Sequence, residues 1–161
     1  MKSIILFRHA RAERCDLGRD HDRPLASKGI ADAKKMGLYL SGGKLLPEIV
    51  ISSTALRAKM TGETAMEEGK WSCPLILESG IYGGTPLFLL NLVNKQDDAI
   101  SSICLIGHEP NFSNFIARST NSAYQRFPKG SMARIEFDIE SWEDIKMGFG
   151  SLNWLVEPGR I

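Results

Sequence analysis

Residues 4–13 read IILFRHARAE, and four apolar residues at 4–7 run directly into Arg8 and His9. A short continuous run of β-branched and large apolar residues is typical of a strand covered on both faces, as in a parallel sheet. The sequence therefore predicts a buried strand that ends by placing a guanidinium beside an imidazole. In isolation, such a pair favours an exposed strand end, so its meaning depends on the rest of the chain.

Further stretches have the composition of strands, and helix-like segments alternate with them. The predicted strands are 3–7, 48–52, 74–77, 102–106, 133–139 and 152–156. The first predicted helix, 27–41, is capped by Ser27 and stopped by Gly42 and Gly43, and the second, 54–68, is capped by Ser53 or Thr54. A third helix begins at Thr85-Pro86, and a fourth is capped by Asn111. We expect one domain, residues 1–161, with an α/β fold of three layers. Its sheet is mainly parallel, with helices on both faces and an antiparallel strand at one end.

The composition is that of a soluble globular protein, with 43% apolar and 24% charged residues among 161. Twenty basic residues against nineteen acidic ones leave a formal charge of +1. This balance argues against a broad nucleic-acid surface or a polybasic membrane surface, although it allows a small local anion site. No apolar run approaches the roughly 18 residues that span a bilayer, so we expect no membrane association.

The cysteines and the N-terminus indicate a cytoplasmic protein. Cys15, Cys73 and Cys104 are odd in number and form no C-x-x-C pair, which argues against a disulfide framework and a zinc ribbon. Arg8 and His9 interrupt the N-terminal apolar run, which is unlike a signal peptide. We expect no metal and no cofactor.

Polar side chains follow three of the predicted strands at the point where each ends. These are Arg8 with His9, Arg57 in the helix start after the second strand, and His108 with Glu109. Ligands of parallel sheets sit beyond the carboxyl ends of the strands. If these strands are neighbours, two imidazoles and two guanidiniums converge at one edge of the sheet.

This set of groups suits phosphoryl chemistry. Two arginines can hold a tetrahedral oxyanion through forked donors, and the helix start at Ser53 or Thr54 can add further donors. A neutral imidazole can attack phosphorus, and a second, protonated imidazole can stabilise charge on the equatorial oxygens.

The segment LFRHARAE at 6–13 resembles the Arg-His signature of the histidine phosphatase superfamily, which also contains the cofactor-dependent phosphoglycerate mutases. Three further segments are similar to family segments in the same order: DHDRPLASKG at 20–29, ISSTALRAKMTGET at 51–64 and LIGHEPNFS at 105–113. In addition, FPKGSMARIEF at 127–137 resembles a late turn and strand of the short branch typified by SixA-type phosphohistidine phosphatases. Together the matches extend from Ile4 to about Phe137.

The resemblance implies a phosphoglycerate mutase-like fold with a metal-independent phosphatase activity. It implies that His9 is the phosphorylated nucleophile and that Arg8, Arg57 and His108 complete the catalytic, phosphate-binding pocket. Ala10 stands where much of the superfamily has glycine, but it is also small and is compatible with the turn.

Hydrolysis of a phosphate ester needs an acid for its alkoxide leaving group. The segment between Arg57 and His108 offers Glu78 as a possible acid, although the fuller mutase pattern is absent. Asp22 and His21 are possible acid or rim residues, and Asp16 and Asp20 could also border the pocket. Imidazole, whose conjugate acid has a pKa of about 6.5, leaves more easily than an alkoxide. A compact site without a dedicated acid or a long lid therefore favours phosphohistidine displayed on a protein.

Two alternatives stay open at this stage. The chain could act on small phosphomonoesters or as a phosphoglycerate mutase-like enzyme. It could also be a non-catalytic module that binds phosphohistidine, although an intact nucleophile argues against this. The expected partner is a phosphate-bearing substrate, most simply a histidine-phosphorylated protein.

Overall fold

The structure is a computed structural model and describes residues 1–14 and 18–161. Cys15 and Asp16 lie outside the described residues. The strands are β1 Lys2–Arg8, β2 Ile49–Ser52, β3 Leu75–Leu77, β4 Ser102–Gly107, β5 Met132–Phe137 and β6 Gly150–Val156. The α-helices are α1 Ser27–Gly42, α2 Leu56–Gly69, α3 Pro86–Asn94 and α4 Asn111–Ser119. All six predicted strands and all four predicted helices are therefore confirmed, and the predicted ends agree with the observed ones to within two residues.

The strands form a sheet in the order β3-β2-β4-β1-β5-β6. Strands β3, β2, β4 and β1 are mutually parallel, and β5 is antiparallel to both β1 and β6. The predicted α/β class, with its mainly parallel sheet and antiparallel strand towards one end, is confirmed. This order makes β1, β2 and β4 neighbours, as the convergence of their polar ends requires.

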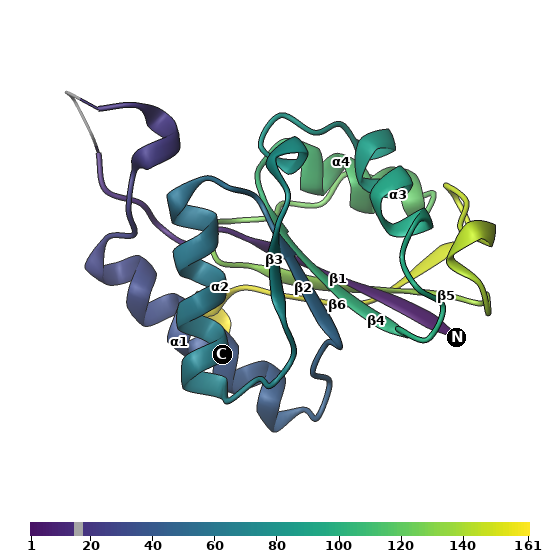
Figure 1. Cartoon of the computed structure of the whole chain (residues 1–161), viewed down its shortest axis with the longest axis horizontal. Helices are drawn as coiled ribbons and strands as arrows, with labels where there is room; N and C mark the ends of the chain where they lie inside the picture. Colours follow the sequence, from purple (N-terminus) through teal and green to yellow (C-terminus); the bar gives the residue numbers. More distant parts are fainter. Residues whose placement is uncertain (15–17) are drawn as a thin grey trace.

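Helices cover both faces of the sheet, with α1 and α2 on one side and α3 and α4 on the other (Figure 1). The apolar side chains of β1 alternate between the two layers, because successive strand residues point to opposite faces. Ile5 and Phe7 pack with Met36 and Leu40 of α1, whereas Leu6 packs in the core that α3 and α4 supply. The continuous apolar run therefore reflects a strand buried on both faces.

The predicted helix caps are only partly correct. Thr85 caps α3 by accepting a hydrogen bond from the Phe88 N–H at 3.1 Å, as its place before Pro86 predicts. The cap prediction for Ser27 is wrong, since this residue is the first residue of α1 and makes no capping bond.

Two other capping predictions are also wrong. Neither Ser53 nor Thr54 is the N-cap of α2, because Ala55 occupies that position. Asn111 is the first residue of α4 and follows the N-cap Pro110. Caps depend on the local backbone dihedrals, so residue type alone does not fix them.

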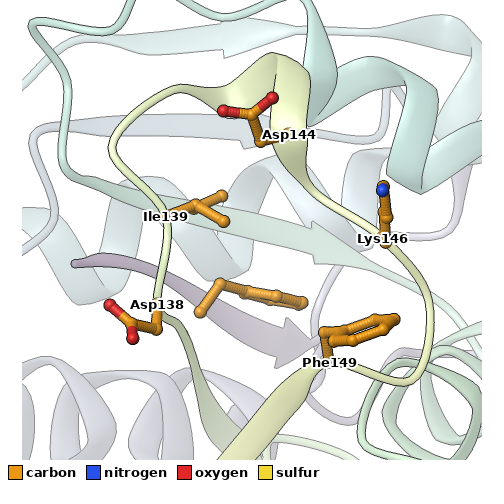
Figure 2. A pocket seen from close by; sticks show the side chains of 6 residues that line it. Asp138, Ile139, Asp144, Lys146 and Phe149 are labelled. Carbon is orange, nitrogen blue, oxygen red and sulfur yellow. The ribbon is translucent and has the colours of Figure 1, made fainter.

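The end of the sheet opposite the carboxyl end of β1 carries a hollow of about 450 Å³. Figure 2 shows Ile139 and Phe149 among its lining side chains, with Asp138, Asp144 and Lys146 around them. Phe137, which also lines it, pairs with Lys2 at the first residue of β1, so the hollow is remote from His9. In residues 1–14 and 18–161, no helix has the length and apolar character that membrane crossing requires.

Candidate active site

The carboxyl ends of β1, β2 and β4 lie at the same level of the sheet. In the parallel register Arg8 is paired with Gly107 and Ser52 with Ile106. The residues that follow these strands therefore leave the sheet side by side. As a result, His9 and His108 face one another with ring centroids 5.2 Å apart and planes inclined by 51°. Both residues are buried, with 7% and 6% of their surfaces exposed.

The hydrogen bonding of His9 determines its tautomer. Nδ1 of His9 lies 2.8 Å from the carbonyl oxygen of Ala10, which can only accept a hydrogen bond. Nδ1 therefore carries the proton, and the lone pair of the neutral ring lies on Nε2. The hydrogen bond made by one ring nitrogen thus determines that the other nitrogen is the nucleophile, and it also orients the ring.

Burial lowers the pKa of His9 from its ordinary value to about 3. The hydrogen bond to Ala10 acts in the opposite direction, while His108, in its protonated form, and the charges of Arg57 and Arg8 lower the pKa further. The His9 imidazole is consequently neutral at neutral pH, which is the form that can attack an electrophile.

A buried hydroxyl connects the His9 turn to the helix that carries Arg57. The Ala10 N–H donates to Oγ1 of Thr61 at 3.0 Å, and the Thr61 hydroxyl donates to the carbonyl of Arg57 at 2.7 Å. Thr61 is fully buried, so this link is shielded from competition by water. It therefore fixes the end of β1 relative to the first turn of α2.

His108 contacts the loop after β2. Its Nε2 lies 2.8 Å from Oγ of Ser53, and this oxygen also accepts a hydrogen bond from the Ala55 N–H at 3.2 Å. Burial, followed by the charge of Arg57, lowers the pKa of His108 to about 4. His108 is therefore neutral in the phosphate-free protein. An incoming dianion would favour the protonated form, since opposite charges raise the pKa of an imidazole.

Asp20, in the segment before α1, binds the guanidinium of Arg57. Its Nη1 donates to the carbonyl of Asp20 at 2.9 Å, and its Nη2 donates to the Asp20 carboxylate at 3.0 Å. The Tyr82 hydroxyl donates to the same carboxylate, and Arg57 lies over the Tyr82 ring, 5.8 Å from its centroid. Tyr82 also meets His108 edge to face at 5.3 Å. Asp20 and Tyr82 thus connect the second arginine to the second histidine.

Arg8 is anchored on the other side of His9. Its Nη1 donates to the carbonyl of Phe127 at 3.0 Å, while its buried Nε has no hydrogen-bond partner among the described residues. Burial lowers the pKa of Arg8, and the nearby Glu109 and Tyr124 oppose that effect. A buried guanidinium N–H without a partner is costly, so this donor is well suited to an oxyanion.

The possible acid and rim residues lie in different places. The Glu78 carboxylate accepts a hydrogen bond from the Gly80 N–H at 3.3 Å, at the start of a short 3-10 helix, Ser79–Ile81. Asp22 is exposed and pairs with Arg19, three residues before it, at 3.3 Å. His21 meets Tyr82 edge to face at 4.8 Å and so lies at the rim of the cluster.

The sequence alone does not point to Tyr82 or Thr61, and it identifies Asp20 only as a possible border residue. Hydrogen bonds to Tyr82 and Arg23 lower the pKa of Asp20, so its carboxylate is ionised and is unsuited to act as an acid. The position of Thr61 four residues after Arg57 was a usable signal, because both then lie on one face of a helix. Tyr82 had no such signal, since its partners are far away in the sequence.

Residues 4–81 match the sequence model of the histidine phosphatase superfamily (branch 1). This range contains Arg8, His9 and Arg57, whereas His108 lies beyond it.

Individual relatives extend the similarity over nearly the whole chain. An uncharacterized chloroplastic protein of Arabidopsis thaliana is 30% identical over 97% of this chain and 76% of its own length. The phosphohistidine phosphatase SixA of Escherichia coli is 25% identical over 96% of this chain and 93% of its own. Among solved structures, the protein histidine phosphatase SixA complexed with tungstate superposes with a TM-score of 0.80. That match has 24% sequence identity and covers 98% of this chain and 97% of the other.

Proposed function

The chain belongs to the histidine phosphatase superfamily and is a phosphatase, and we propose that it removes the phosphoryl group from phosphohistidine on another protein. His9 is the proposed nucleophile, with Arg8, Arg57 and His108 around the phosphoryl group. The observation that carries this proposal is the buried, neutral His9 ring, whose Nδ1 is committed to Ala10 and whose Nε2 keeps its lone pair.

The reaction proceeds in two displacements at phosphorus. Nε2 of His9 attacks, its bond to phosphorus forms, and the P–N bond of the substrate breaks. The bonding electron pair leaves with the substrate imidazole, which departs as a neutral ring because its other nitrogen carries a proton. Water then attacks phospho-His9, the new P–O bond forms as the bond from phosphorus to Nε2 breaks, the electron pair returns to Nε2, and the protons of the water leave with orthophosphate or to solvent.

Arginine and histidine donors stabilise the charge on the transferring group. Arg8 and Arg57 supply planar N–H donors to its oxygens, as tetrahedral oxyanions require. The dianion raises the pKa of His108, so the ring becomes protonated when the substrate is present and donates a hydrogen bond during transfer.

The carboxylates near the site support a phosphoramidate in preference to an ester. Asp20 is ionised, and Glu78 caps a 3-10 helix. An ester needs a protonated acid for its leaving alkoxide, whereas imidazole leaves without one because its conjugate acid has a pKa of about 6.5. The names of the related SixA proteins, a phosphohistidine phosphatase and a protein histidine phosphatase, agree with this substrate class.

Trapping the covalent intermediate tests the proposal. The protein is mixed briefly with a radiolabelled phosphohistidine peptide, quenched in alkali and examined for acid-labile label on the chain. Wild type should carry label, His9→Ala should carry none, and the rim control His21→Ala should still be labelled. Circular dichroism verifies that His9→Ala is folded.

A substrate panel separates the alternatives. The expected order is faster turnover of phosphohistidine peptides than of sugar phosphates. Faster turnover of sugar phosphates would instead assign the chain to small phosphomonoesters. Tight binding of the phosphopeptide without label or hydrolysis would contradict an enzymatic role.

A further inference from the structure

A groove of about 480 Å³, lined in part by Arg8, is rich in basic side chains. Its basic residues are Arg8, Arg11, Lys28, Arg126 and Lys129. They come from the end of β1 and the loop after it, from the first turn of α1, and from the segment before β5. Since the whole chain has a formal charge of only +1, this groove concentrates positive charge on one part of the surface.

The two acidic residues of the groove are less exposed than their basic partners. Asp32 and Glu157 have 13% and 21% of their side-chain surfaces exposed, compared with 68% for Lys28 and 73% for Arg126. The Lys28–Asp32 and Arg126–Glu157 pairs measure 3.2 Å and 3.7 Å. Surface pairs of this kind contribute about 1 kcal/mol or less, so they leave the cations available to a partner. The face presented to solvent is therefore strongly positive.

Lys129 experiences the positive charge of several arginines. Its pKa is lowered first by burial and then by the charges of Arg8, Arg11, Arg23 and Arg57. Among the described residues, neither Arg8 nor Lys129 forms a salt bridge. Mutual repulsion of this kind is relieved when an anionic ligand binds.

Arg8 links the groove to the proposed active site, because it lines the groove, precedes His9 in the chain and acts electrostatically on the His9 ring. The segment that forms one wall is fixed at Phe127, which accepts a hydrogen bond from Arg8 and is buried. On the same segment Tyr124 is 67% exposed and lies near enough to Arg8 to influence it. Exposed tyrosine and arginine are the residue types that contribute most at protein interfaces.

We infer that this groove binds an acidic segment of the substrate protein, next to the phosphohistidine that enters between Arg8 and His9. The inference rests on the proposed function and names what selects the substrate. The walls of the groove are open and carry long, exposed basic side chains, which complement the charge of an extended segment rich in carboxylates. A compact anion would instead require buried, converging donors.

Two phosphohistidine peptides of equal length test the inference, one flanked by Asp and Glu and the other by Asn and Gln. At low ionic strength, wild type should have about tenfold higher kcat/KM for the acidic peptide, mainly through KM, and physiological salt should reduce this preference. The double variant Lys28→Glu/Arg126→Glu should lose the preference. The control Lys34→Glu, a charge reversal on the same helix but outside the groove, should retain it. Equal kcat/KM for the two peptides in wild type, or equal losses in both variants, would overturn the inference.

A binding measurement separates this inference from the proposed phosphatase function. Fluorescence anisotropy is recorded with the acidic peptide lacking phosphate, for wild type and for both charge variants. If neither phosphopeptide is hydrolysed but wild type binds the acidic peptide about tenfold more tightly than the double variant, the groove assignment stands and the proposed reaction fails. If both phosphopeptides are hydrolysed at equal rates, the proposed reaction stands and the groove assignment fails. Equally tight binding of an oligonucleotide of the same charge would also overturn the assignment to an acidic protein segment.

Discussion

Asp20 holds the guanidinium of Arg57 at two points, through its backbone carbonyl at 2.9 Å and its carboxylate at 3.0 Å. The proposed phosphate-binding arginine therefore already has an anionic partner when no phosphate is present. Because both anions are attracted to the same donors, Asp20 competes with phosphate while it keeps Arg57 directed towards the site.

Replacing Asp20 with asparagine should therefore strengthen the binding of inorganic phosphate. The Asp20 side chain is 51% exposed, so solvent weakens the charge effect, and we expect inhibition by phosphate to tighten by about fivefold or less. The inhibition constant of inorganic phosphate, measured as a competitive inhibitor of peptide hydrolysis in wild type and variant, gives this change. Asp22→Asn is the matched control, since Asp22 pairs only with exposed Arg19 among the described residues. Weaker inhibition by phosphate in Asp20→Asn would contradict the prediction and would mean that the Asp20 carboxylate contributes more by orienting Arg57 than it costs by competing with phosphate.

The buried histidines should make the phosphate-free protein less stable in mild acid. An unfolded histidine titrates near a pKa of about 6.5, whereas His9 and His108 titrate at about 3 and about 4 when folded. As the pH falls below about 6.5, the unfolded chain binds protons that the native state does not, so stability is lost, by up to about 1.4 kcal/mol per pH unit for each histidine. Between about pH 6.5 and 5, above most carboxylate titrations, denaturant unfolding should show this slope.

The double variant His9→Gln/His108→Gln should flatten that pH dependence, because glutamine does not titrate. The single variant His21→Gln serves as the control at the rim of the site. Parallel slopes for wild type and the double variant would rule out the two buried rings as the source.

The Thr61 hydroxyl should matter for both stability and activity. Thr61→Val keeps the shape but leaves the buried Ala10 N–H without an acceptor, which should cost about 1–3 kcal/mol of unfolding free energy. It should also lower kcat/KM, because the backbone that orients His9 loses its link to α2. Thr61→Ser keeps the hydroxyl and should retain more activity than the valine variant. Equal kcat/KM values in the two variants would argue against a positioning role.

The close approach of α1 and α2 depends on Gly37. A Cβ atom at this position would lie 2.2 Å from the carbonyl oxygen of Ala65, and backbone cannot yield as a flexible side chain can. Gly37→Ala should therefore destabilise the protein by about 3 kcal/mol or more in thermal or denaturant unfolding. Gly42→Ala on the same helix meets no atom within 4 Å and should be neutral or stabilising by about 0.5 kcal/mol. Similar losses in both variants would refute the steric explanation.

The sequence by itself determined the elements of the sheet and the residues at the ends of its strands. Continuous apolar runs identified strands buried on both faces, because burial on both sides removes the alternation of polar residues. Arg8, His9 and His108 follow such runs directly, so their placement at the carboxyl edge is a local property of the chain. In α4 the apolar residues Phe112, Phe115 and Ile116 recur at helical spacing, and all three are buried.

Only the tertiary structure decided how these residues are held and what surrounds them. Asp20 reaches Arg57 across 37 residues and Tyr82 across 62, and Thr61 reaches Ala10 across 51. The basic groove likewise combines side chains from segments far apart in the sequence. Such contacts depend on where loops settle after the sheet has formed, and neither periodicity nor residue type encodes that placement. The residues at the strand ends could be predicted because their position follows directly from the strands that precede them in the chain. The groups that hold Arg57 and line the groove come together only when the chain folds.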